Sequence, residues 1–139
     1  MIIDATDLIL GRLSAFVAKK ALMGETISII NAEKAVITGQ PKRILADYKQ
    51  TRNRGAPLIG PYFPRTPERI VKRTIRGMIP YKKARGREAL ARVKCYSGVP
   101  EEFSGKEITK MPENMHVEKT HAKYVTIKRI SQELGAKVE

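Results

Sequence analysis

The sequence predicts an α/β fold: a small, mostly parallel sheet of about four strands sandwiched between helices, with a long basic loop and an extended C-terminal arm. Short apolar runs rich in β-branched residues alternate with segments whose apolar residues recur at helical spacing. The chain has 139 residues, of which 42% are hydrophobic. This is enough for one domain, residues 1–139, with a sizeable core.

Three segments have the composition of buried strands, namely residues 1–4, 26–32 and 35–38, and a last core strand is predicted near residues 93–98. Between the first two, Leu13, Phe16, Val17 and Ala21 recur at helical spacing, and Gly24 stands where a C-terminal helix cap belongs. A strand, a helix and a second strand in this order predict a right-handed parallel crossover.

A second helix is predicted to begin at Pro41, because proline suits the first helical position. Helical spacing then turns Ile44, Leu45 and Tyr48 inward and leaves a basic outer face that includes Lys49.

Residues 51–65 are predicted to form a long loop, because the segment holds two glycines and three prolines. Loops of this length inside a compact domain are usually functional or disordered. The loop carries three arginines, Arg52, Arg54 and Arg65. Tyr62 and Phe63 have two interpretations: they stack on unpaired bases, or they pin the loop to the core.

A third helix is predicted over residues 66–77, with Thr66 as the N-cap, Pro67 at the first helical position and Glu68 at the positive end of the helix dipole. At 100° per residue, one side is apolar and consists of Ile70, Val71, Thr74, Ile75 and Met78. The opposite side is a stripe of four cations: Arg69, Lys72, Arg73 and Arg76. The pattern predicts one face for the core and one for phosphates.

After Pro80, four more cations lie at a turn into a short helix over residues 88–93: Lys82, Lys83, Arg85 and Arg87. Residues 98–123 mix proline, glycine and alternating charges without a regular period, which predicts an extended surface arm. The chain then closes with a short helix capped by Thr126, with Ile127, Ile130 and Leu134 on its apolar side.

The positive charge is confined to one part of the chain. The net charge is +13, and residues 42–94 hold sixteen basic and three acidic residues, whereas the remainder holds eleven of each. A charge run is usually a solvated face, but self-repulsion on this scale is costly unless a polyanion lies against it. The distribution favours a protein that binds an anionic partner through its middle segment.

Signals for catalysis and for metal or cofactor binding are weak. His116 and His121 are five residues apart and have no accompanying cysteine pair, and Cys95 lies in a strand pattern typical of a core residue. The glycines match no phosphate-binding loop, and capping or turn roles explain Asp4 and Asp7 more simply than acid–base chemistry does. We therefore expect no enzyme activity, cofactor, metal or small-molecule substrate.

The lone cysteine and the absence of a signal-peptide pattern predict a cytoplasmic protein. No apolar run approaches the roughly 18 residues that a membrane-spanning helix needs, so an integral membrane role is not expected.

Two segments resemble the universal large-subunit ribosomal protein thirteen family. "DATDLILGRLSAFVAKKALMGETISIINAEKAVITG" is similar to the opening of that family, and "RGMIPYKKARGREALARVKCYSGVP" to its central signature. The loop sequence "RGAPLIGPYFPRTPERI" is similar to the archaeal and eukaryotic branch. The resemblance implies a compact α/β domain that binds large-subunit rRNA beside neighbouring large-subunit ribosomal proteins, aids subunit assembly and has no catalytic role.

The resemblance places Arg76, Lys82, Lys83, Arg85 and Arg87 on RNA phosphates, and the helix geometry adds the remaining stripe residues. The loop arginines are placed to reach between RNA helices, since A-form RNA is bound chiefly through its shape, phosphates and 2′-hydroxyls. Gly77 and Gly86 are expected to let the backbone approach RNA or turn tightly. The candidate RNA-binding residues are Arg52, Arg54, Arg65, Arg69, Lys72, Arg73, Arg76, Lys82, Lys83, Arg85 and Arg87.

Two other functions fit part of the pattern. A free DNA-binding protein would also use a basic helix, but no pair of helices joined by a short glycine-containing turn precedes it. A small nucleotide-dependent or RNA-modifying enzyme would fit the same α/β layers, but it would require a phosphate loop or a metal cluster.

Overall fold

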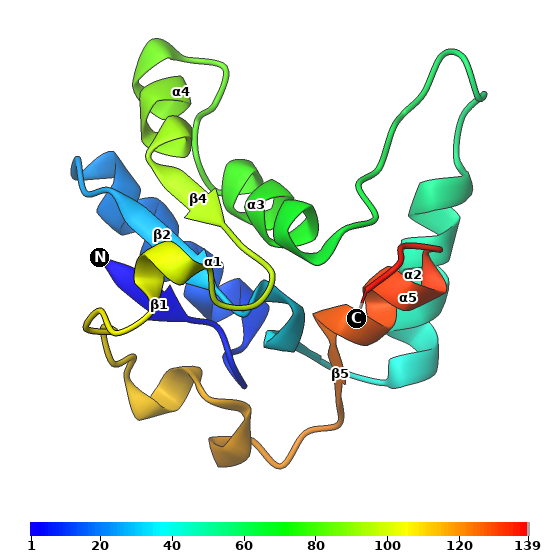
Figure 1. Ribbon diagram of the computed structural model, residues 1–139. Coiled ribbons are helices and arrows are strands. Elements are labelled where there is room, and N and C mark those ends of the chain that lie inside the picture. Colours follow the sequence, from blue (N-terminus) through cyan, green and yellow to red (C-terminus); the bar gives the residue numbers. More distant parts are fainter. Residues whose placement is uncertain (139) are drawn as a thin grey trace.

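A computed structural model describes residues 1–138 (Figure 1). In this part of the chain, the helices are α1 (Leu10–Leu22), α2 (Pro41–Asn53), α3 (Pro67–Gly77), α4 (Ala84–Ala91) and α5 (Ile127–Glu133). The strands are β1 (Ile2–Asp4), β2 (Ile27–Ile30), β3 (Val36–Thr38), β4 (Val93–Cys95) and β5 (Tyr124–Thr126). The predicted α/β class is confirmed.

The main sheet is parallel, with strand order β1-β2-β4. Ile3 pairs with Ile29, which pairs with Cys95 on the other side. The predicted unit of strand, helix and strand is therefore present as β1, α1 and β2. Gly24 has a φ of 99° and follows the end of α1, so it occupies the left-handed position that a C-terminal cap requires.

Residues 35–38 do not join the main sheet, although their composition resembles that of its strands. After β2, Asn31 has a φ of 53° and residues Ala32–Lys34 form a 3-10 turn, which redirects the chain. As a result, β3 pairs with β5 in a separate antiparallel sheet. The strand β5 consists of residues 124–126, directly before the final helix. The sequence pattern did not predict this strand.

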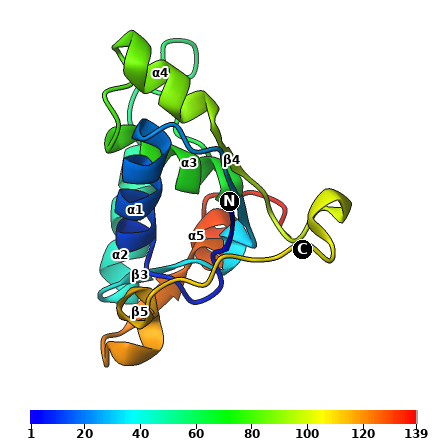
Figure 2. The ribbon, with the colours of Figure 1, turned by 90° about the vertical axis from the view of Figure 1, so that its left-hand side faces the viewer.

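The helices beside the main sheet lie on one face of it. Figure 2 shows α1 and α3 together on one side of the strands, and these two helices pack against each other. On the other face, Ser28 is half-buried and Lys94 is exposed. The sheet therefore carries a helical layer on one side rather than lying between two such layers. The helix α5 packs on α2 and α3 instead.

The α2 helix is longer than predicted, and the loop that follows is correspondingly shorter. Ile44, Leu45 and Tyr48 are half-buried against the core, as expected. The helix continues to Asn53, and the Thr51 hydroxyl donates to the Asp47 carbonyl over 2.9 Å within its last turns. The loop therefore spans residues 54–66, and Figure 1 shows it as a long excursion between α2 and α3.

The α3 helix begins and ends where the sequence predicts, with Ile70, Val71 and Ile75 buried on one side. Two details differ. Thr66 has N-cap backbone geometry, but its side chain makes no capping hydrogen bond. Met78 is 44% exposed because it lies past the last helical turn, where the 100° spacing no longer applies.

The α4 helix begins at Ala84 rather than at residue 88, so Arg85 and Arg87 lie on its first turns. The predicted start is too late because the sequence pattern places Gly86 in a turn, whereas it lies inside the helix. A Cβ atom at Gly86 would lie 2.0 Å from the Pro80 carbonyl oxygen, so the turn after α3 packs directly on the backbone of α4. In the sequence, this glycine reads as a turn signal, but in the structure it is buried within α4 and lets the two backbone segments pack closely.

Residues 98–123 wrap the surface as predicted, and they are anchored at several points. Short 3-10 turns occur at Glu101–Phe103, Glu113–Met115 and Val117–Lys119. The Thr109 amide donates to the Ile2 carbonyl over 2.8 Å, so the arm covers the free edge of β1. Val117 is 4% exposed, which fixes the far end of the arm. Thr126 then caps α5, where its hydroxyl accepts from the Arg129 amide over 3.4 Å.

Candidate nucleic-acid interface

Four cations on the outer face of α3 line one shallow cleft. Arg69, Lys72, Arg73 and Arg76 surround a cavity of about 310 Å³ whose remaining walls are Tyr62, Pro64 and Leu90. We call this cavity the α3 cleft. Among the described residues that line it, none is acidic. The helical stripe predicted from the sequence is therefore present, and α4 and the loop close it into a groove.

Two arginines of the α3 cleft are held in place by aromatic rings. The Arg73 guanidinium lies 4.7 Å from the centre of the Phe63 ring, and the Arg76 guanidinium lies 4.9 Å from that of Tyr81. Stacking fixes the plane of a guanidinium and leaves its N–H edges available to donate to phosphate oxygens. These side chains therefore lose less conformational entropy on binding an anion than free arginines would.

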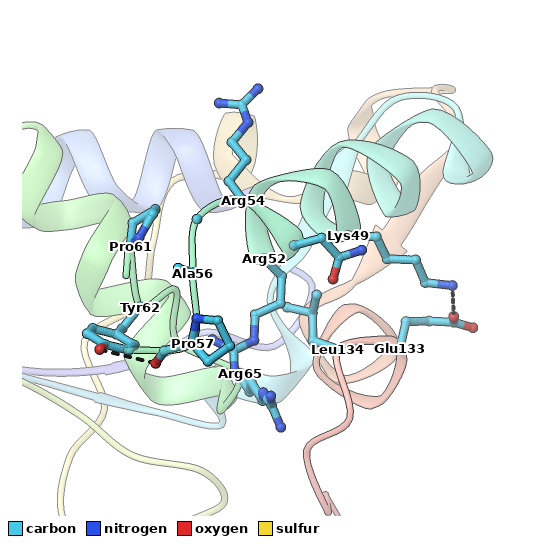
Figure 3. A pocket seen from close by; sticks show the side chains of 12 residues that line it. Lys49, Arg52, Arg54, Ala56, Pro57, Pro61, Tyr62, Arg65, Glu133 and Leu134 are labelled. Atoms are coloured by element: carbon cyan, nitrogen blue, oxygen red, sulfur yellow. Dashed lines mark hydrogen bonds and ion pairs between the residues drawn. The ribbon is translucent and has the colours of Figure 1, made fainter. Parts of the chain in front are cut away.

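A second cavity, of about 630 Å³, lies between the C-terminal half of α2, the loop and α5 (Figure 3). We call it the α2–loop cavity. Its basic lining residues are Lys49, Arg52, Arg54 and Arg65. In Figure 3, Arg54 extends away from the other lining side chains and Arg65 extends to the opposite side.

Two of these four cations already have partners within the protein. Arg52 lies on α2, and its Nη1 donates to the Phe63 carbonyl over 2.9 Å, so it holds the loop in place. Lys49 Nζ lies 2.8 Å from a carboxylate oxygen of Glu133 on α5. The hydrogen bond from Lys49, together with its charge, lowers the pKa of the Glu133 carboxyl. Arg54 and Arg65 are therefore the residues of this group best placed to bind a phosphate.

The remaining candidates, Lys82, Lys83, Arg85 and Arg87, lie around the start of α4 and are all exposed. Arg87 Nη2 donates to the Lys82 carbonyl over 3.3 Å, which ties the first turn of the helix to the segment before it. The group does not line the α3 cleft, but Leu90 of the same helix does. The two sets of cations therefore lie on connected elements.

Tyr62 and Phe63 have different roles, which the sequence alone left open. Phe63 is half-buried and packs edge-on against Tyr48, with ring centres 5.9 Å apart. Tyr62 is 65% exposed and lines both the α3 cleft and the α2–loop cavity. Only Phe63 pins the loop. No sequence signal distinguishes the two neighbouring aromatic residues.

The acidic residue nearest the stripe in sequence, Glu68, faces away from the α3 cleft. Its carboxylate accepts from the Ser97 hydroxyl over 2.8 Å. Partial burial raises the pKa of Glu68, but hydrogen bonds from its own amide and from Ser97, together with the nearby Thr66 hydroxyl and the charge of Arg69, outweigh this effect and lower it. Glu68 is therefore favoured as a carboxylate at the positive end of α3, and it does not line the α3 cleft.

Two of the residues considered for catalysis, Cys95 and Asp4, have structural roles. Burial raises the pKa of Cys95 to about 12, so it remains a thiol beside the core. Asp4 accepts from the Thr6 amide over 2.9 Å and from Asn31 over 3.1 Å, which is the predicted turn role. Within residues 1–138, no cluster of His, Cys, Asp and Glu is suited to a metal ion. In the same range, no helix has both the length and the apolar character needed to cross a membrane.

Taken together, the fold and the two cavities define a small α/β protein that gathers cations in two surface hollows.

Comparison with known proteins gives the family. A model of the family "Ribosomal protein L13" matches residues 1–102, and the chain therefore belongs to this family. The chain is 51% identical over 138 residues to the large ribosomal subunit protein uL13 of Methanosarcina barkeri, covering 98% of both chains. It is also 51% identical over 136 residues to the protein of the same name from Archaeoglobus fulgidus, covering 96% of this chain and 86% of the relative.

A third relative is the large ribosomal subunit protein uL13 of Methanococcoides burtonii. The two chains are 48% identical over 136 residues, and the match covers 98% of each. These relatives are archaeal, which agrees with the branch that the loop sequence resembles. The resemblance inferred from two sequence segments is confirmed over nearly the whole chain.

Proposed function

We infer that this protein is a structural constituent of the large ribosomal subunit, where it binds large-subunit rRNA and aids assembly of the subunit. Its place in the cell is then the cytoplasmic ribosome. Membership of the ribosomal protein L13 family supports a structural role rather than an enzymatic one. The observation that carries the RNA-binding mode is the α3 cleft, in which four cations lie together on one side of a helix whose other side is core.

We further propose an order of importance among the candidate residues. The four cations of the α3 cleft bind phosphates, because they converge on one groove and two of them are held by aromatic stacking. The exposed group Lys82, Lys83, Arg85 and Arg87 extends this surface along α4. Arg54 and Arg65 bind RNA from the two ends of the loop, whereas Arg52 acts by holding the loop.

The tip of the loop is suited to a protein neighbour rather than to phosphates. Leu58 is 92% exposed and Ile59 is 85% exposed, and residues 55–64 contain no charged side chain. An exposed apolar patch of this kind is typical of a protein contact. We propose that this tip contacts a neighbouring protein of the large subunit.

Sedimentation of a cell lysate tests the function. Mass spectrometry of gradient fractions should find the protein with large ribosomal subunits, and ribonuclease treatment should release it. A pool on chromatin would favour a DNA-binding protein, and a pool that is free of both would favour an enzyme. Either of the last two results would contradict the proposed function.

A further inference from the structure

Tyr62 is an exposed aromatic residue between two basic cavities. Its ring lines the α3 cleft on one side and the α2–loop cavity on the other, and the residue is 65% exposed. An exposed tyrosine is not unusual by itself, because aromatic rings are large. Its position is informative, because each of the two cavities that it joins is lined by four basic side chains.

Contacts within the loop itself hold the Tyr62 ring in place. The Tyr62 hydroxyl donates to the Pro57 carbonyl over 3.3 Å, a bond drawn in Figure 3. The loop is closed behind the ring, where the Gly60 amide donates to the Ala56 carbonyl over 3.0 Å. Gly60 is buried, and a Cβ atom there would lie 3.2 Å from two carbons of the ring, so backbone and ring are in close contact. A ring fixed in this way loses little entropy on stacking.

Anchoring of the loop does not explain the exposed position of Tyr62, because its neighbours already perform that role. Phe63 packs on Tyr48 and Arg73, and its carbonyl accepts from Arg52. Tyr62 is therefore free to present its face to a ligand. Flat apolar faces flanked by cations are the arrangement by which proteins bind unpaired nucleotides, with the base on the ring and the phosphates on the cations.

We propose that Tyr62 is a stacking platform for one unpaired nucleotide, and that the phosphates on either side of this nucleotide bind cations of the α3 cleft and of the α2–loop cavity. This inference rests on the proposed binding of RNA and adds the form of RNA that is bound. A continuous duplex presents its backbone and not the face of a base, so it can use the cations but not the ring. Any base can stack, because every base has a π-face.

Two RNA hairpins that differ by a single bulged 2-aminopurine test the proposal with the full-length protein. Stacking of the bulged base on Tyr62 should quench its fluorescence, and the bulged hairpin should bind roughly tenfold more tightly than the paired one. Tyr62→Phe keeps a ring and should keep both effects. Tyr62→Leu should lose the quenching and the preference, while its affinity for the paired hairpin stays unchanged.

Leu58→Ala is the matched control, because Leu58 is exposed on the same loop and lines neither cavity. It should behave as the wild-type protein does. Equal affinity for the two hairpins, or quenching that persists in Tyr62→Leu, would overturn the stacking role and leave phosphate binding intact. If the wild-type protein bound neither hairpin, the proposed RNA binding itself would be contradicted, and the stacking role with it.

Discussion

At the residue scale, the chain contains positions whose identity is set by a single close contact. Gly86 and Gly77 show the contrast. A Cβ atom at Gly86 would lie 2.0 Å from the Pro80 carbonyl oxygen and 2.3 Å from the Pro80 carbonyl carbon. At Gly77, a Cβ atom would meet nothing within 4 Å. Both glycines are helical, so the difference between them is steric and not a matter of backbone conformation.

Gly86→Ala is expected to lower the free energy of unfolding by about 1–3 kcal/mol, because the added methyl group meets backbone that cannot move as a side chain can. Gly77→Ala should instead raise it by up to about 1 kcal/mol, since alanine favours the helix and the space is open. Urea denaturation of both variants measures the two effects. Equal changes would show that close packing at Gly86 is not the decisive factor.

Asp4 gives a pH dependence. Partial burial raises the pKa of Asp4, but hydrogen bonds from the Thr6 side chain and amide and from Asn31 outweigh this and lower it below its ordinary value. Because the folded-state pKa is the lower one, the carboxylate stabilises the fold above the unfolded-state pKa. This stability is lost as the pH falls through the folded-state value.

Asp4→Asn should therefore lower the free energy of unfolding by about 1–2 kcal/mol at pH 7 and by much less near pH 2. Thr6→Val removes one donor and should give part of the same loss. Unfolding curves at several pH values provide the measurement. A loss that is the same at pH 2 and pH 7 would show that the charge of Asp4 does not contribute.

At the element scale, one side of α3 packs in the core and the other side faces the α3 cleft. Ile70, Val71 and Ile75 are at most 1% exposed, whereas the four cations face the α3 cleft. The helix therefore contributes to the core through one set of residues and to the proposed RNA surface through another. Substitutions on the two sides are expected to have separate consequences.

Replacement of Arg69, Lys72, Arg73 and Arg76 together by glutamine should leave the protein folded, since glutamine has a similar helix propensity. The loss of two cation–π contacts is offset by reduced self-repulsion, so we expect a change in stability within about 1 kcal/mol. Binding of an RNA fragment should weaken, and the slope of log affinity against log salt should fall in magnitude by about three.

Circular dichroism melts and salt-series titrations distinguish the outcomes. The wild-type slope should correspond to at least about six phosphate contacts. Ile75→Asp is the contrasting variant, and it should unfold the protein by burying an unpaired charge. A quadruple variant that unfolds, or that keeps the wild-type slope, would show that the α3 cleft is not the RNA surface.

At the scale of the whole molecule, a neutral body carries a cationic middle segment. One core cluster includes Leu13 of α1, Ile29 of β2, Ile75 of α3, Val125 of β5 and Ile130 of α5. Elements from both ends of the chain therefore share buried contacts. The α2 helix contributes no fully buried residue and packs through half-buried side chains.

Because the core is shared, we propose that residues 1–139 form one domain and expect a single cooperative unfolding transition. Far-ultraviolet circular dichroism reports on the helices, and tyrosine fluorescence reports on packing near rings such as Tyr48. The two probes should give the same midpoint. An earlier transition seen by one probe would show that α2 and its neighbours unfold separately.

The sequence by itself determined the local elements and the location of the charge. Helical spacing in residues 67–77 places cations and aliphatic residues on opposite sides, and runs of isoleucine define β1 and β2. These signals are local, because side-chain direction follows from the backbone period alone. Of the eleven candidate residues, helical spacing gives the four of the α3 stripe, and the structure brings these four together in the α3 cleft.

Only the tertiary structure decided which partners these elements meet. The pairing of β3 with β5 joins segments far apart in the chain, and the different roles of Tyr62 and Phe63 depend on what lies against each ring. Arg52 binds a carbonyl of the loop, and Gly86 admits the backbone of Pro80. Composition and period do not predict such contacts, because the contacts arise from close packing between segments that the fold brings together.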